Sequence, residues 1–329
     1  MVNGAGTSLR IVFYGTPEFA VPSLEGLLAS RHQVVGVVTR PDQPSGRGQR
    51  LQVPPVKRAA LTRGLAVLQP ERLADEAFLN ALAAFQADLG VVAAYGRIFS
   101  ESLLQSVRFG FINVHASLLP RFRGAAPVQR AVMAGETTTG VTIMRLVRAL
   151  DAGPMLANAS RPIGPEETSE EVERGLSTLG ARLLAGVIEE LAHGRAIEVP
   201  QDESEATYAP RLEKSDGPID WRQSARTIHD KVRGLHPWPH AHTYLGATRY
   251  IILQTRVEPS VTHPPSGMTA QPGETLEAAG DVLRVATGDG SLRILQVQPE
   301  GRRALTAREF LAGHPIKSGT IFGGLPHQQ

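Results

Sequence analysis

The chain of 329 residues contains no cysteine. A protein without thiols cannot form disulfides, iron–sulfur clusters or thiolate zinc sites, and it cannot use a cysteine nucleophile. Long apolar runs are missing too, because no stretch of about 18 apolar residues occurs that could span a membrane. Residues 1–10, MVNGAGTSLR, lack the apolar core of a signal peptide. We therefore expect a cytoplasmic protein with no membrane contact.

A strong excess of charge is also absent, since the formal net charge is +2. So small a charge does not mark the whole chain as a nucleic-acid-binding protein, although it is compatible with a local basic patch. The composition, 42% hydrophobic and 20% charged, is ordinary for a globular protein. The length allows two domains.

Apolar strands alternate with helical segments through the first half of the chain. Leu9 to Gly15 is a continuous apolar strand of the kind that is buried on both faces of a parallel sheet. No GxGxxG motif follows it, so the dinucleotide-binding fingerprint is missing. The alternation predicts an α/β fold with a doubly wound, mostly parallel, Rossmann-like sheet and right-handed crossovers. We assign this catalytic domain to residues 1–194.

The pattern changes after residue 194. A polar, proline-containing stretch over residues 195–214 is typical of a linker. Residues 215–329 then contain short strands separated by turn signals, which predict a small β-barrel of the OB type. Gly288-Asp289-Gly290 is the clearest of these signals and predicts a hairpin between two strands.

Polar side chains occur where core packing would not place them. Asn113 and His115 lie two residues apart in the apolar strand that begins at Phe111, so they project from the same side of a sheet. Asp151 follows the next apolar strand, in the turn sequence LDAGP. Open α/β sheets bind ligands at the carboxyl ends of their strands. The three side chains are therefore expected to converge on one cleft.

Three kinds of chemistry can be weighed for this trio. A metal site is disfavoured because Asn is a weak ligand and no second His or Glu lies at ligand spacing. A hydrolase triad is disfavoured because the GxSxG nucleophile elbow is absent. Transfer of an acyl-type group by direct attack needs no enzyme nucleophile. An amide can stabilise the oxyanion, an imidazole can move protons, and a carboxylate can set the charge of the imidazole or act as a base.

A basic loop rich in proline and glycine covers residues 40–55, with Arg47 between two glycines. It is either a solvated surface loop or a contact for a polyanion, and its length favours the second interpretation. Arg302, Arg303 and Arg308 form another basic cluster near the chain end. For that cluster a solvated face and a contact with an RNA backbone remain equal alternatives.

These motifs together resemble the folate-dependent formyltransferases, and among them the methionyl-tRNA formyltransferases. The resemblance covers Leu9 to Phe310. It is carried by GTPEFAVPSL, PSGRG, VAAYG, INVHASLLPRFRGAAP, TGVTIM, LDAGPML, IDW and HPWP. INVHASLLP and LDAG are typical of the wider fold, whereas the GRG loop and the IDW and PWP sequences narrow the match to the tRNA enzymes.

The resemblance implies a formyl transfer from 10-formyltetrahydrofolate to the α-amine of methionine on initiator methionyl-tRNA, by a monomer that requires no metal. It makes Asn113, His115 and Asp151 the catalytic residues. It places the folate against two segments: Val92, Ala93, Ala94 and Tyr95, and Ser117, Leu118, Leu119 and Pro120. It assigns tRNA contacts to Arg47, Arg50, Arg302 and Arg303.

Two positions depart from the family pattern. Gln49 stands where a Lys is frequent after the GRG, which removes one positive charge, and Ala149 replaces a frequent Gly before LDAG. The same trio would also serve a formyltransferase acting on a sugar-nucleotide amine or on glycinamide ribonucleotide, or a formyltetrahydrofolate hydrolase. A folate- or RNA-binding module without catalysis is the alternative from another class, and the intact trio argues against it.

Overall fold

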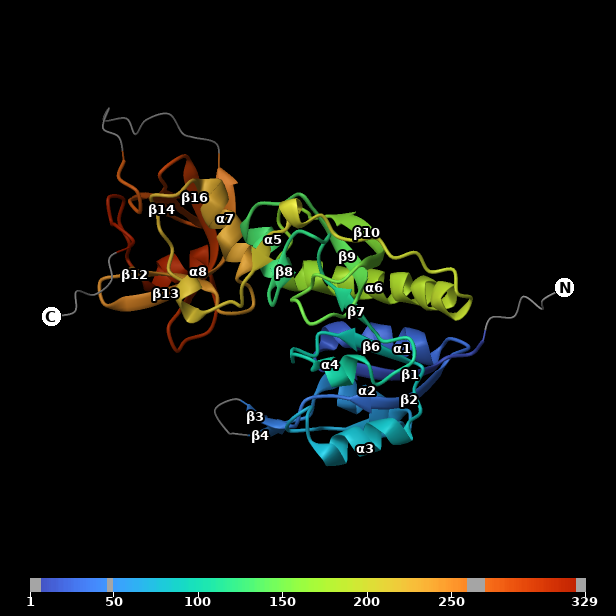
Figure 1. The fold of residues 1–329 in the computed structure, drawn as a ribbon. Coiled ribbons are helices and arrows are strands. Elements are labelled where there is room, and N and C mark those ends of the chain that lie inside the picture. Colours follow the sequence, from blue (N-terminus) through green and yellow to red (C-terminus); the bar gives the residue numbers. More distant parts are fainter. Residues whose placement is uncertain (1–6, 46–49, 259–269, 324–329) are drawn as a thin grey trace. The chain divides into compact units, whose positions relative to one another are not determined.

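The computed structural model describes residues 7–45, 50–258 and 270–323, and the chain divides into two compact units (Figure 1). The first unit comprises Met1–Pro127, Thr138–Pro162 and Glu173–Ala209. The second comprises Val128–Thr137, Ile163–Val172 and Pro210–Gln329. Each unit is built around its own sheet.

The first unit contains a seven-stranded sheet in the order β10-β9-β7-β6-β1-β2-β5. Its strands are β1 (Arg10–Gly15), β2 (Gln33–Val38), β5 (Val67–Leu68), β6 (Leu89–Ala93), β7 (Phe111–His115), β9 (Thr138–Arg145) and β10 (Met155–Pro162). The pairs from β5 to β7 are parallel, whereas β9 and β10 are antiparallel to their neighbours. The predicted mostly parallel sheet is confirmed.

Helices cover both faces of this sheet (Figure 1). They are α1 (Val21–Leu28), α2 (Pro55–Thr62), α3 (Glu76–Ala84), α4 (Glu101–Leu104) and the long α6 (Ser169–Ala192), with a 3-10 turn over Glu18–Ala20. On one face, Val12 and Tyr14 of β1 share a buried cluster with Phe78 of α3 and Leu103 of α4. On the other, a Cβ at Gly180 of α6 would lie 2.9 Å from Val114, so glycine lets this helix approach β7 closely.

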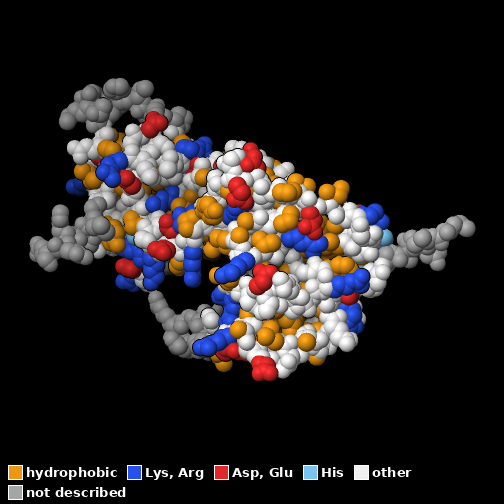
Figure 2. Space-filling model, in the orientation of Figure 1, with side chains coloured by type: hydrophobic (Ala, Val, Ile, Leu, Met, Phe, Trp, Pro, Cys, Tyr) orange, Lys and Arg blue, Asp and Glu red, His pale blue; other side chains and the backbone are white. Residues whose placement is uncertain are grey.

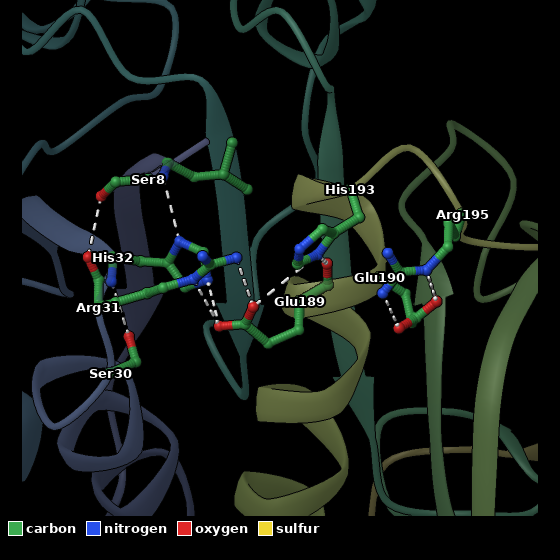
Figure 3. Close-up of polar contacts among 9 residues, drawn as sticks. Ser8, Ser30, Arg31, His32, Glu189, Glu190, His193 and Arg195 are labelled. Carbon is green, nitrogen blue, oxygen red and sulfur yellow. Dashed lines mark hydrogen bonds and ion pairs between the residues drawn. The ribbon is translucent and has the colours of Figure 1, made fainter. Parts of the chain in front are cut away.

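A polar cluster ties the start of the sheet to the end of α6 (Figure 3). The backbone N–H of Leu9 donates to Nδ1 of His32 at 3.1 Å, so the ring proton sits on Nε2 and is donated to Glu189 at 3.1 Å. Arg31 forms an ion pair with the same carboxylate at 2.6 Å. Partial burial raises the pKa of Glu189, but the hydrogen bond and charge of Arg31 outweigh it and hold this pKa below its ordinary value.

The basic loop contains a short hairpin, which its sequence did not predict. Strand β3 (Gln43–Ser45) pairs antiparallel with β4 (Arg50–Gln52) as a separate two-stranded sheet. A proline is tolerated in such an isolated ribbon because no further strand needs its missing N–H. The hairpin is anchored at its base, where Asp42 accepts hydrogen bonds from Lys57 at 2.8 Å and from Gln69. These two bonds hold the pKa of Asp42 below its ordinary value.

The second unit contains a six-stranded antiparallel sheet in the order β12-β13-β16-β15-β14, with β17 beside β16. Its strands are β12 (Ala241–Leu245), β13 (Thr248–Glu258), β14 (Thr275–Ala279), β15 (Val282–Ala286), β16 (Ser291–Pro299) and β17 (Leu305–Thr306). The helices not yet named are α5 (Pro127–Met133), α7 (Ala225–Gly234) and α8 (Ala307–Gly313). The hairpin predicted at Gly288-Asp289-Gly290 is confirmed, since it joins β15 to β16.

The two edges of this sheet are brought together by the chain near its end. Phe322 donates its N–H to Gly273 beside β14 at 2.7 Å, and Gly323 donates to Tyr244 of β12 at 2.9 Å. The strands therefore close into a small barrel, as the sequence predicts. In neither unit does a described helix combine the length and the apolarity needed to cross a membrane. Lys and Arg side chains are interspersed with Asp and Glu on the visible surface (Figure 2).

Candidate active site

Strand β7 places Asn113 and His115 on one side of the first unit's sheet. Asn113 pairs in register with Val92 of β6 and with Met144 of β9, so it lies inside the sheet and not at its edge. Its apolar neighbours Ile112 and Val114 are buried on the other side. No described residue forms a hydrogen bond with the half-buried side-chain amide of Asn113. The amide is therefore available to a ligand.

Asp151 is brought to the same place by the turn between β9 and β10. Its side chain is 12% exposed, and Oδ2 lies 3.7 Å from Nδ1 of His115. The same oxygen accepts a hydrogen bond from the backbone N–H of Gly124 at 2.9 Å. The residue adopts a left-handed backbone conformation, with φ of 47°. A non-glycine residue persists in this conformation only where its surroundings determine it.

The imidazole of His115 is buried between two acceptors. Nε2 lies 3.0 Å from the carbonyl oxygen of Phe122, while Nδ1 faces the carboxylate of Asp151. A neutral ring carries one proton and can donate to only one of these groups. An imidazole beside a carboxylate can take part in proton transfer and in electrostatic stabilisation.

The segment from Ser117 to Pro120 is held as a compact turn after β7. Thr142 of β9 donates its hydroxyl to the carbonyl of Ser117 at 2.8 Å and accepts the N–H of Leu119 at 3.1 Å. The Ser117 hydroxyl is itself buried and donates to the carbonyl of Arg121 at 2.7 Å. One threonine on the neighbouring strand thereby fixes the segment next to the trio.

The second segment assigned to folate comprises the last two residues of β6 and the two residues after it. Val92 and Ala93 are buried, whereas Ala94 is exposed and has a left-handed φ of 47°. The ring of Tyr95 points into the core, where it meets the rings of Tyr14 and Phe99 edge to face. Burial raises the pKa of the Tyr95 hydroxyl. This segment therefore offers backbone, and not the tyrosine side chain, to a ligand.

Two residues of the site were not identified from the sequence. Arg123, only 2% exposed, forms hydrogen bonds with Gln201 and an ion pair with Glu203 at 2.8 Å. Gln201 in turn donates to the carbonyls of Asp151 and Gly153. Arg123 lies within the motif INVHASLLPRFRGAAP, so its segment, although not its role, could be found from the sequence. Gln201 lies in the stretch interpreted as a linker, where no motif points to it.

The candidate tRNA-binding residues are spread over both units. Arg47 and Gln49 lie outside the described residues, and Arg50 begins β4. In the second unit, Arg302 and Arg303 are exposed, and Arg303 forms an ion pair with Glu309 at 2.9 Å. No group of three or more metal-ligating side chains occurs within the part of the chain that the structure describes.

Comparisons with known proteins place both parts of the chain in one family. Residues 9–188 match the formyl transferase family, and residues 211–315 match the formyl transferase C-terminal domain. An N-formyltransferase from Helicobacter canadensis, solved with folinic acid and dTDP-3-aminofucose, has a similar fold. It matches with a TM-score of 0.65 at 15% identity, over 88% of this chain and 99% of its own. The two family matches, which together cover most of the chain, thus define a formyl transferase.

Two curated relatives are similar over almost their whole length. The methionyl-tRNA formyltransferase of Moorella thermoacetica is 44% identical over 316 residues, which cover 96% of this chain and 99% of the relative. That of Heliobacterium modesticaldum is 45% identical over 317 residues, covering 96% and 100%. The chain belongs to the methionyl-tRNA formyltransferase family.

Proposed function

We propose that this protein transfers the formyl group of 10-formyltetrahydrofolate to the α-amino group of methionine on initiator methionyl-tRNA. The observation that carries the proposal is the convergence of Asn113, His115 and Asp151 in the first unit. The near full-length similarity to methionyl-tRNA formyltransferases supports the choice of substrate. Such a reaction serves translation initiation, so we place the protein in the cytoplasm. We also expect it to act as a monomer, as the family resemblance implies.

The reaction needs no covalent enzyme intermediate. The neutral α-amine attacks the formyl carbon, and the carbonyl electrons move to the formyl oxygen. The bond from the formyl carbon to N10 of the folate then breaks, the attacking nitrogen loses a proton and N10 gains one. The protein has to stabilise the oxyanion and carry this proton.

Asn113 suits the first task because its amide N–H groups are not used by any described residue. A donor that is already oriented stabilises the oxyanion without reorganisation when the charge develops. His115 contributes the second donor in its protonated form. Its Nε2 proton is shared with the Phe122 carbonyl at 3.0 Å, so the formyl oxygen has to replace that carbonyl as the acceptor.

Asp151 suits the second task. Its carboxylate lies 3.7 Å from Nδ1 of His115 and can stabilise the positive ring, and it can receive the amine proton through a water molecule. The folate is proposed to lie between the turn from Ser117 to Pro120 and the backbone from Val92 to Tyr95. Both segments flank the trio in the sheet, because β6 lies directly beside β7.

We assign tRNA binding to the basic hairpin loop and to the second unit. Arg47 and Arg50 would contact the acceptor end, and Arg302 and Arg303 the backbone elsewhere. Cations that neutralise phosphates make binding dependent on salt. The second unit is a small barrel, and barrels of this kind frequently bind nucleic acids.

Formyl transfer from 10-formyltetrahydrofolate to purified initiator methionyl-tRNA tests the proposal. Elongator methionyl-tRNA, a sugar-nucleotide amine and glycinamide ribonucleotide serve as parallel acceptors. We expect rapid transfer to the initiator tRNA alone. Transfer to a small amine but to neither tRNA would contradict the assigned acceptor and would support a different formyltransferase. No transfer to any acceptor would contradict the assigned reaction.

A further inference from the structure

The stretch from residue 199 to residue 209 lies along the candidate site. Val199 exchanges two backbone hydrogen bonds of 2.8 Å with Met155 at the start of β10. The backbone carbonyl of Thr207 accepts a hydrogen bond from the N–H of Arg123 at 2.8 Å, and its hydroxyl accepts one from the N–H of Phe122 at 2.9 Å. We call residues 199–209 the site strap. Although its composition is that of a linker, it belongs to the first unit.

The site strap approaches the loop after β7 closely at Gly124. This glycine has φ of 124°, and a Cβ there would lie 2.6 Å from the carbonyl oxygen of Ala209. The short pair β8 (Arg123–Gly124) and β11 (Tyr208–Ala209) is parallel, so the two segments run side by side. The site strap therefore supports the same loop that contacts both His115 and Asp151.

Gln201 is the residue of the site strap that reaches the Asp151 turn. Its amide nitrogen donates to the carbonyl oxygens of Asp151 and Gly153, each at 2.8 Å. Its amide oxygen accepts two hydrogen bonds from Arg123, at 2.8 Å from Nη2 and 3.1 Å from Nε. Both donors and both acceptor positions of the amide are thus used.

These bonds explain how Asp151 keeps its left-handed backbone. A non-glycine residue keeps this conformation only with support from its surroundings. Two carbonyls of the turn are fixed by one side chain, and this determines the direction in which the Asp151 carboxylate points. The guanidinium of Arg123, fixed by the same amide, holds the loop whose Phe122 carbonyl and Gly124 N–H contact the catalytic side chains.

We propose that Gln201 is a positioning residue for formyl transfer, which sets the relative placement of Asp151 and His115 by joining the Asp151 turn to Arg123. The expected effect of Gln201 on catalysis rests on the proposed function. Gln201 touches neither of the two catalytic side chains, so it acts through the backbone of the turn and through the loop after β7.

The decisive variant is Gln201→Glu. The carboxylate still accepts from Arg123, but it cannot donate, and it places an oxygen against the two turn carbonyls. A displacement of about 1 Å in a catalytic group costs about 100-fold in rate. We expect kcat to fall by about 10- to 100-fold, while KM for the folate and for initiator methionyl-tRNA stays within about twofold.

Gln201→Met serves as the second variant, because it removes all four hydrogen bonds without adding a charge. Gln105→Glu is the matched control, since Gln105 is an exposed residue at the end of α4 whose amide donates a hydrogen bond to Glu101. Hydrogen exchange of the backbone amides of residues 122–126 and 151–153 is measured on the same proteins. We expect faster exchange in both Gln201 variants and wild-type exchange in the control.

The outcomes separate the inference from the proposed function. Folded Gln201 variants with wild-type kcat, or with a loss confined to KM, overturn the positioning role. Unchanged hydrogen exchange overturns the structural link itself. If the wild-type protein transfers no formyl group, the proposed function fails and the catalytic consequence fails with it. The exchange measurement then still decides whether Gln201 holds the Asp151 turn.

Discussion

At the scale of single residues, the charge on Asp151 is the property that the proposed mechanism needs most. Asp151→Asn keeps the shape of the side chain and an oxygen that can accept from Gly124, but it removes the negative charge beside His115. General acid–base contributions of this kind amount to about 100- to 10,000-fold. We expect kcat to fall within that range in steady-state assays, with KM for initiator methionyl-tRNA little changed.

Asp75→Asn is the control for this substitution. Asp75 precedes α3, is exposed, and forms no side-chain capping bond. Its variant should transfer at the wild-type rate. Turnover of Asp151→Asn at more than a tenth of the wild-type rate would remove the carboxylate from the mechanism.

The proximity of His115 and Asp151 could be predicted from the sequence because its signals are local. Asn113 and His115 stand out as polar residues in an apolar strand, and Asp151 stands out in a turn that follows the next strand. Gln201 could not be found in this way. It contacts Arg123, which is 78 residues away in the sequence, and nothing in its own neighbourhood requires a glutamine.

At the scale of secondary-structure elements, the junction between β1, the turn before β2 and the end of α6 gives a stability prediction. Glu189 joins this junction through His32 and Arg31 (Figure 3). Since its folded-state pKa is lowered, it contributes stability above the ordinary carboxyl pKa of 4.5, and this is lost as the pH falls through the folded-state value. The Glu189 side chain is 39% exposed, so the contribution is below about 1 kcal/mol.

We therefore expect Glu189→Gln to lower the midpoint of thermal unfolding slightly at pH 7. The difference from wild type should shrink as the pH is lowered below 4.5. Glu190→Gln is the matched control, because Glu190 forms its ion pair at 2.8 Å with Arg195, which follows the same helix. An identical midpoint for wild type and Glu189→Gln at pH 7 would show that the junction does not depend on this carboxylate.

Two elements show where composition is a poor guide. Proline and glycine in residues 40–55 predict a loop, yet β3 and β4 pair there, because an isolated hairpin needs only two short partners. Residues 199–209 have the composition of a linker, yet their backbone groups pair with the site. In both cases the structure is decided by hydrogen bonds to a partner segment. The composition of the segment itself does not reveal them.

At the scale of the whole molecule, the order of the strands in the first unit explains why one site can be built from distant segments. Strand β7 lies between β6 and β9. The parallel strands β6 and β7 end at the same edge of the sheet, and the turn between β9 and β10 brings Asp151 to His115 there. The alternation of strands and helices predicts such a sheet. The reversal of β9 could not be predicted, since strand direction depends on how the chain crosses the sheet and not on the strand's own residues.

The whole molecule has a small net charge of +2, so recognition of a tRNA has to rest on particular cations and not on a uniformly basic surface. We predict that Arg47→Ala lowers kcat/KM for initiator methionyl-tRNA by about 10-fold at low salt, because one phosphate contact is lost. The slope of log kcat/KM against log salt concentration should become shallower by about one unit. Binding of the folate should be unchanged.

Arg63→Ala is the control for this prediction. It removes an exposed arginine of the same unit that lies outside the hairpin, and it should alter neither the slope nor the rate. A wild-type slope for Arg47→Ala would mean that the loop does not contact phosphate, and the electrostatic part of recognition would then belong to the second unit.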